Sequence, residues 1–346
     1  MSQLPQGAAK IEWIDCIKGS GILLVAAAHI VLYGTPARDA IHVFHMPLFF
    51  FLSGFLFKPD RDSFGYAVKK ARHLLVPYFV FLALLSVPIM VKMTLAGKGT
   101  SQLLVQLAGG QGIGGTMAVF WFVTCLYFTQ QVMNLLLARW SIGIVALVVV
   151  AGLAASYVNL WYPWFALPLN LHVVPAAMPY FFLGYLCKGR ALSAAAAAPA
   201  WIGSAIAVAL VLSGYLVAQD MKYTIYGIPV VSLALAMCMI VAFMQANLYL
   251  ARVKPIAAVL TGLGRYSMGI MFMHMPIAVA LRTVSPAGSE TVRFIVAVIA
   301  SYGLSLAFDR FTLTRSIFLG AAHRAKPASE TPPARPARPA APTGPA

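Results

Sequence analysis

Residues 11–33 read IEWIDCIKGSGILLVAAAHIVLY, an apolar segment long enough to cross a lipid bilayer as a single helix. A transmembrane helix needs about 20 mostly apolar residues, and the apolar core of a cleavable signal peptide is shorter than this segment. We therefore expect a helix that is retained in the protein. Ionisable residues inside such a helix are costly and usually functional, and this segment contains Asp15, Lys18 and His29.

These polar side chains are spaced to lie on one face of the helix. Lys18 and His29 are eleven positions apart, close to three helical turns and about 16 Å of rise, and Asp15 precedes Lys18 by three positions. The same helix contains small residues that allow close helix packing. A polar stripe on a closely packed helix indicates a protein-lined cavity. Two structural interpretations stay open: an interfacial Asp15–Lys18 pair with a snorkelling lysine, and a packed His29 bonded to a carbonyl.

The composition of the whole chain agrees with a membrane protein. Of its 346 residues, 61% are hydrophobic and 10% are charged, against about 45–50% and about 25% in soluble domains. Backbone groups in lipid must be satisfied internally, and the long unalternating apolar runs favour helices over a barrel. We predict an all-α integral membrane protein, a bundle of about ten transmembrane helices. The expected spans are residues 11–33, 41–57, 73–95, 116–138, 141–158, 173–187, 201–218, 226–248, 255–281 and 291–313.

Two details of this division depend on glycine and proline. The span 255–281 is long enough to contain a break near Gly262–Gly264, and the glycine-rich segment 96–115 is expected to be a loop. Residues 1–320 form the predicted membrane domain. Residues 321–346 alternate Ala, Pro and Arg and are expected to be a disordered cytoplasmic tail.

The basic residues predict an orientation. The net charge of +16 arises largely from Lys and Arg in loops, and most of these loops lie on the side of the N-terminus. Cytoplasmic loops carry such an excess, so both termini are expected in the cytoplasm of a multi-pass protein of the plasma (inner) membrane. The positive-inside pattern explains the charge, and no nucleic-acid partner is expected.

The second expected span carries two histidines one helical turn apart, His42 and His45 in IHVFHMPLFFFLSGFLF, residues 41–57. No acidic or cysteine ligand stands at metal-binding spacing beside them, and the four cysteines form no CxxC pair. We therefore predict no metal site. His45 is expected at a depth similar to that of His29, where both would line a site.

A dense basic segment precedes the third expected span: KPDRDSFGYAVKKARHLLVPY, residues 58–78. Lys69 and Arg72 share a helical face there. They suit either a positive-inside anchor or a clamp for phosphate groups. His274, in IMFMHMPIAV (270–279), is a further histidine within an expected span.

Together these motifs resemble acyltransferase family 3, which includes the membrane-bound glycan O-acetylases. The resemblance rests on the D-x-x-K pair followed by His29, on FHMPLFFFLSGFLF (44–57, with His45 and Ser53), and on a basic pair spaced by two, with lysine at position 69 where the family has arginine. Weaker similarities are WFVTCLYF (121–128, beginning at Trp121), MPYFFLGYLCKG (178–189) and LGRYSMGIMFMHMPI (263–277). The likeness covers about residues 11–313.

The resemblance implies roughly ten helices and an acyl-CoA donor, usually acetyl-CoA, entering from the cytoplasm, with no permanently bound cofactor. The acceptor would be a hydroxyl of an envelope or exported glycan or of a lipid-linked sugar. We expect His29 to act as the base for that hydroxyl, because histidine titrates near neutral pH. Lys18, Lys69 and Arg72 would bind the donor.

The remaining site residues have supporting roles: Asp15, His45, Ser53, Trp121 and His274. Two chemical routes stay open, direct attack of the hydroxyl on the thioester and an acetyl-histidine intermediate. No carboxylate in the sequence is suitably placed to orient His29.

Two other functions remain as alternatives. A secondary transporter also has intramembrane His and Lys, although we find no internal repeat and no paired broken helices in the sequence. The other alternative is a non-catalytic subunit of an envelope complex, which would not need Lys18 or His29.

Overall fold

The structure, a computed structural model, describes residues 8–109, 115–161, 167–188, 193–216 and 219–321. Within these ranges the chain is helical, with one isolated bridge between Asp220 and Ile225. The predicted tail, apart from Ala321, lies outside the described residues. In chain order the α-helices are α1 (Ala8–His29), α2 (Pro36–His42), α3 (His45–Leu56), α4 (Ser63–Leu95), α5 (Ser101–Gly109), α6 (Trp121–Arg139), α7 (Ile142–Trp161), α8 (Val174–Leu186), α9 (Ala194–Leu212), α10 (Val231–Leu250), α11 (Lys254–Arg265), α12 (Ser267–Val284), α13 (Glu290–Arg310) and α14 (Thr312–Leu319). Three short 3₁₀ segments are η1 (Gly115–Met117), η2 (Pro168–Val173) and η3 (Met221–Tyr223).

Nine helical stretches in the described residues are long and apolar enough to cross a membrane. They are Pro36–Leu56, Ser63–Leu95, Gly115–Arg139, Ile142–Asn159, Pro168–Leu186, Ala195–Leu212, Val231–Leu250, Ser267–Val284 and Glu290–Arg310. The first predicted span, 11–33, corresponds to α1, which carries three charged residues, Glu12, Asp15 and Lys18, and packs against α10, α11 and α12. The protein is an all-α, multi-pass membrane protein, as predicted.

The structure divides two of the predicted spans. The span 41–57 contains the end of α2 and all of α3, with non-helical backbone at Phe44, and Pro47 fits the first turn of α3 because it needs no N–H partner there. The span 255–281 is also broken, but at Tyr266 between α11 and α12 and not at the glycines.

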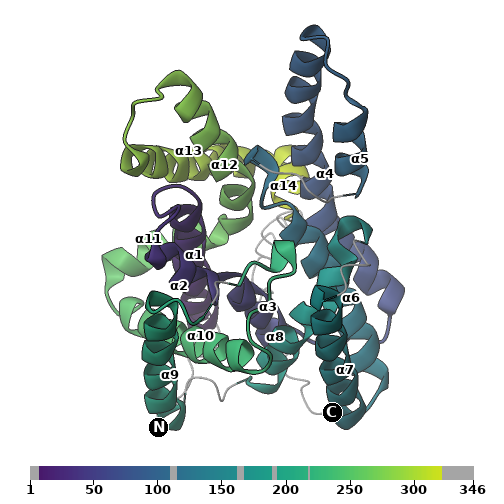
Figure 1. Ribbon diagram of the computed structural model, residues 1–346, viewed down its shortest axis with the longest axis vertical. Helices are drawn as coiled ribbons and strands as arrows, with labels where there is room; N and C mark the ends of the chain where they lie inside the picture. The colour runs from purple at the N-terminus through teal and green to yellow at the C-terminus, as the bar shows by residue number, and fades with distance from the viewer. Residues whose placement is uncertain (1–7, 110–114, 162–166, 189–192, 217–218, 322–346) are drawn as a thin grey trace, which may run out of the picture.

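Polar helical turns account for the other differences from the sequence prediction. The third span starts at Ser63, where Asp62 caps α4 by accepting a hydrogen bond from the Gly65 amide. Hydropathy detected only the apolar part of this helix, whose far end projects beyond the rest of the bundle (Figure 1). The predicted loop 96–115 contains the short helix α5, and α14 was not expected at all.

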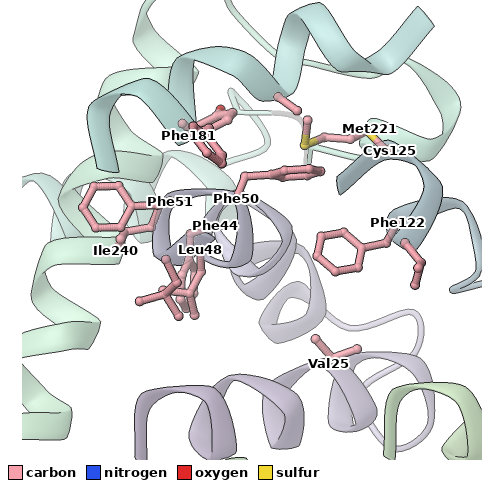
Figure 2. Packing of buried hydrophobic residues seen from close by; sticks show 14 of the residues in the cluster. Val25, Phe44, Leu48, Phe50, Phe51, Phe122, Cys125, Phe181, Met221 and Ile240 are labelled. Atoms are coloured by element: carbon pink, nitrogen blue, oxygen red, sulfur yellow. The ribbon is translucent and has the colours of Figure 1, made fainter. Parts of the chain in front are cut away.

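Helix α3 lies at the centre of the apolar core. Phe50 and Phe51 are completely buried, and Figure 2 shows them pointing to opposite sides of α3, Phe51 toward Ile240 and Phe50 toward the side of Cys125 and Met221. The Phe50 and Phe122 rings are 5.2 Å apart. The aromatic run of the second span therefore packs the interior, which leaves helices such as α7 and α9 to cover the bundle with exposed apolar side chains.

Two glycines allow α1 to pack closely against α11. A Cβ atom on Gly19 would lie 1.9 Å from the Leu260 carbonyl oxygen, and one on Gly264 would lie 1.8 Å from the Asp15 carbonyl oxygen. Both distances are far inside van der Waals contact, so only glycine allows the two backbones to approach this closely. This contact holds the end of α1 that carries Asp15 and Lys18.

Candidate active site

One cavity of about 1130 Å³ runs along α1 and is lined by residues of α1, α2, α3, α4, α6 and α12. Lys18 and His29 both line it. This is the placement that their eleven-residue spacing predicted, because α1 is a continuous helix over both residues. We call the two regions of the cavity the lysine end, around Lys18, and the histidine end, around His29.

Four histidines from four helices meet at the histidine end. The His29 ring stacks on His274 with ring centroids 5.6 Å apart, and its edge approaches His42 at 6.3 Å. His42 in turn lies 4.5 Å from His45. His274 is completely buried and does not line the cavity, whereas His29 is half-buried and faces it.

In two of these histidines, a backbone carbonyl determines which ring nitrogen carries the proton. The Nδ1 atoms of His45 and His274 lie 3.0 Å and 2.9 Å from the carbonyls of Ile41 and Ile270. A carbonyl only accepts, so Nδ1 carries the proton and Nε2 of each neutral ring is an acceptor. The Nδ1 of His29 is buried with no hydrogen-bond partner in the described part of the chain.

No carboxylate among the described residues bonds to His29. Asp15, the nearest acid on the same helix, instead accepts from Lys18 at 3.0 Å. The His274 ring, stacked on His29, and the His42 ring, which meets it edge-on, therefore orient His29 by packing. Within the described ranges, no cluster of His, Cys, Asp or Glu is arranged to hold a metal ion.

The histidine end also carries cations that the sequence did not single out. Arg38 of α2 and Lys222 of η3 line it, and both are close enough to act on His29 electrostatically. Their aromatic neighbours are Tyr33, 5.3 Å from the Arg38 guanidinium, and Tyr223, 5.1 Å from the Lys222 ammonium. Both tyrosines are more than half exposed and line the cavity. Exposed rings beside ionic groups are suited to contact a sugar, which has apolar C–H faces and many hydroxyls.

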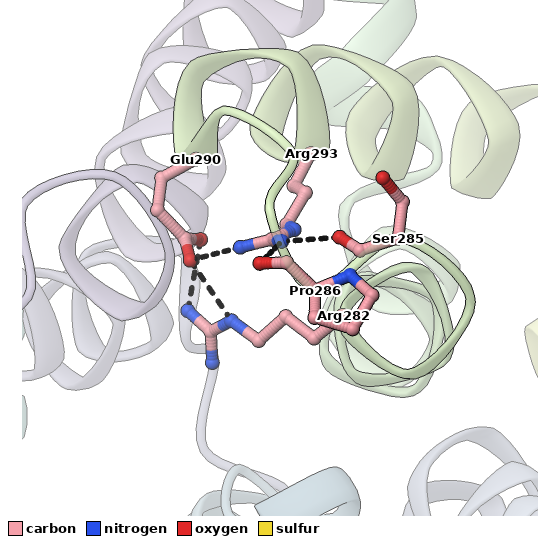
Figure 3. A network of polar contacts seen from close by, with 5 residues as sticks. All are labelled: Arg282, Ser285, Pro286, Glu290 and Arg293. Atoms are coloured by element: carbon pink, nitrogen blue, oxygen red, sulfur yellow. Dashed lines mark hydrogen bonds and ion pairs between the residues drawn. The ribbon is translucent and has the colours of Figure 1, made fainter.

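A third cation at this end, Arg282, is held by an ion-pair network between α12 and α13 (Figure 3). Two of its nitrogens donate to the Glu290 carboxylate at 3.0 Å and 3.2 Å. Glu290 also accepts from the buried Arg293, which donates to the carbonyls of Ser285 and Pro286 at 2.6 Å and 2.8 Å. The network fixes the turn between the two helices and the position of Arg282. The three-residue spacing of Glu290 and Arg293 was the signal in the sequence that could have predicted it.

The lysine end gathers cations from α1 and α4. Lys18, Lys69 and Lys70 line it, and His73 lies within electrostatic range of Lys18 and Lys70. Arg72, which the sequence paired with Lys69, is exposed and does not line the cavity. Its role in donor binding stays a prediction, and Lys70 is the α4 cation that sequence reasoning did not select. An excess of positive charge at a cavity mouth attracts phosphate groups.

Polar side chains from α3 and α6 lie between the two ends. Ser53 lines the cavity and accepts a hydrogen bond from the Gln130 side-chain amide at 2.8 Å. Trp121, at the start of α6, also lines it. The predicted supporting residues are therefore placed as follows: Ser53, His45 and Trp121 face the cavity, while Asp15 and His274 contact residues that do. Gln130 had no signal in the sequence alone.

One family of known proteins matches most of the chain. The acyltransferase domain of acyltransferase family 3 matches residues 11–310. Nodulation protein NolL of Sinorhizobium fredii is 28% identical over 190 residues, which are 50% of this chain and 47% of that protein. The chain thus spans about half the length of this curated relative. No solved structure matches the chain.

Proposed function

This chain belongs to acyltransferase family 3 and is a membrane acyltransferase, and we propose that it transfers an acetyl group from acetyl-CoA to a hydroxyl of an envelope or exported polysaccharide or a lipid-linked sugar. The observation that carries the proposal is that Lys18 and His29 line one cavity from opposite ends. The lysine end suits the phosphates of the donor, and the histidine end suits a sugar hydroxyl.

The reaction needs a base at the point where donor and acceptor meet. In the direct route, neutral His29 takes the proton as the acceptor oxygen bonds to the thioester carbonyl carbon. The C–S bond then breaks, and the protonated His29 returns the proton to the departing thiolate. In the second route His29 first takes the acetyl group itself and releases CoA, and the hydroxyl then attacks the acetyl-imidazole. Either route requires His29 to face the cavity, as it does.

The proposal also explains why such an enzyme would span the membrane. If both termini are cytoplasmic, the lysine end opens toward cytoplasmic acetyl-CoA and the histidine end toward an acceptor across the plasma membrane. The donor and acceptor would then approach from opposite sides and meet at His29.

The test is His29→Ala in native membranes, with the acetyl content of the polysaccharides as readout. We expect a loss of roughly a hundredfold or more, the usual contribution of a general base. His172→Ala is the matched control, because His172 in η2 does not line the cavity. A folded His29→Ala protein that acetylates at the parental rate would refute the assignment, and solute counterflow in liposomes without use of acetyl-CoA would favour a transporter.

A further inference from the structure

The middle of the cavity contains a buried amide to which the proposed acyl transfer gives no role. Gln130 is only 6% exposed and lines the cavity. Its Nε2 donates to Ser53, while its Oε1 is buried without a hydrogen-bond partner among the described residues. Leaving a buried amide oxygen unpaired is destabilising. The neighbouring Gln131 also has a buried amide atom without a partner among the described residues, but only Gln130 lines the cavity, where a ligand could supply the missing hydrogen bond.

The contacts of the next turn of α6 show where Gln130 lies along the cavity. Asn134 is four residues further on the same face and bonds both backbone groups of Asp60, at 2.8 Å and 3.0 Å. Asp60 belongs to the loop that follows α3 and lines the cavity. Gln130 therefore lies about one turn, ~6 Å, from the level of this loop. This loop is near the lysine end, since Phe57 contacts Tyr66, whose ring lies 5.5 Å from the Lys70 ammonium.

The spacing of residues along α3 gives the distance from Gln130 to the histidine end of the cavity. Ser53, the partner of Gln130, comes eight residues after His45, which is ~12 Å along the helix. The cavity wall over this distance is largely apolar, with Val25 of α1 and Leu52 of α3 among its residues. A long ligand passing from His29 to the lysine end would thus meet an apolar wall interrupted by the Gln130 amide and its partner Ser53.

We propose that Gln130 is a recognition subsite for the pantetheine arm of the acyl donor, an inference that rests on the proposed function. Pantetheine has two secondary amides, and the nitrogen of the second is seven bonds from the sulfur, an extended length of ~8 Å. With the sulfur a few ångströms from His29, this N–H reaches the level of Gln130 Oε1. The apolar wall covers the methylene groups on either side, and the phosphates beyond the second amide meet the lysine end.

If Gln130 binds the second amide of pantetheine, its loss should weaken only donors that contain this amide. A structural role would affect donors with and without it alike. S-acetylpantetheine has both amides, whereas S-acetyl-N-acetylcysteamine has only the one nearest to the sulfur. Gln130 should contribute to the binding of the first compound and not of the second. Removing the acceptor oxygen leaves the second N–H of the longer donor buried without a partner.

The experiment measures competition with radiolabelled acetyl-CoA for the purified full-length protein in lipid nanodiscs. We expect Gln130→Leu to weaken acetyl-CoA and S-acetylpantetheine about tenfold and to leave S-acetyl-N-acetylcysteamine unchanged. Gln131→Leu is the matched control, since this neighbouring glutamine does not line the cavity. It should change none of the three affinities.

The possible results separate the subsite from the proposed function. If Gln130→Leu weakens the binding of all three compounds equally, Gln130 has a structural role. If it weakens none of them, Gln130 has no role in donor binding. Either result overturns the subsite, while acetyl-CoA binding by the parent protein leaves the proposed function standing. Failure of the parent protein to bind acetyl-CoA would instead overturn the proposed function and the subsite with it.

Discussion

Replacement of Gly264 by alanine tests whether close packing of α1 on α11 supports both the fold and the donor site. The added Cβ would lie 1.8 Å from the Asp15 carbonyl oxygen, and ordinary contact begins at 3.4 Å, so the two backbones must separate by 1.6 Å. Neither atom belongs to a flexible side chain that could turn away. Overpacking of this kind costs about 1–3 kcal/mol, and the size of the shift places Gly264→Ala near the upper value. The change should lower the unfolding temperature by roughly 5 °C or more.

The assay is thermal unfolding of purified protein in detergent, followed by thiol-reactive dye labelling of buried cysteines such as Cys16 in α1. Gly303→Ala is the matched control, because a Cβ on this mid-helix glycine of α13 meets nothing within 4 Å. It should unfold at the parental temperature or slightly above, since alanine favours helix. Because Asp15 and Lys18 lie beside the contact, Gly264→Ala should also raise the KM for acetyl-CoA. A variant with parental unfolding temperature and parental KM would refute the packing argument.

Two further predictions concern the ends of the cavity. Lys69→Ala should raise the KM for acetyl-CoA several-fold more than Arg72→Ala does, because only Lys69 of the two lines the cavity. Steady-state kinetics in membranes measure both effects, and equal increases would favour the phosphate clamp of Lys69 and Arg72 that the sequence predicted. At the histidine end, burial raises the pKa of the Asp220 carboxyl, so its ionisation destabilises the folded protein as pH rises through that pKa. Asp220→Asn should therefore raise the unfolding temperature at pH 7–8, with the gain shrinking toward pH 4, and a gain that is constant across this range would contradict the reasoning.

The architecture was largely predictable because hydropathy is a property of continuous segments. Each apolar run of about 20 residues must form its own helix in lipid, whatever surrounds it. Polar turns escape this rule, so the start of α4 at Ser63 and the helix α5 were missed. The break at Tyr266 was expected a few residues earlier, since glycine marks weak points in a helix and packing decides where the chain bends.

The candidate site was predictable only where its residues share one helix. The sequence alone determined that Asp15, Lys18 and His29 lie on one face of the first helix, because a helical repeat is local and needs no knowledge of neighbours. Only the tertiary structure decided that His274 stacks on His29 and that Gln130 faces the same cavity. These contacts join segments far apart in the chain, and they depend on how close-packed helices rotate and approach one another, which no periodicity within a single segment specifies.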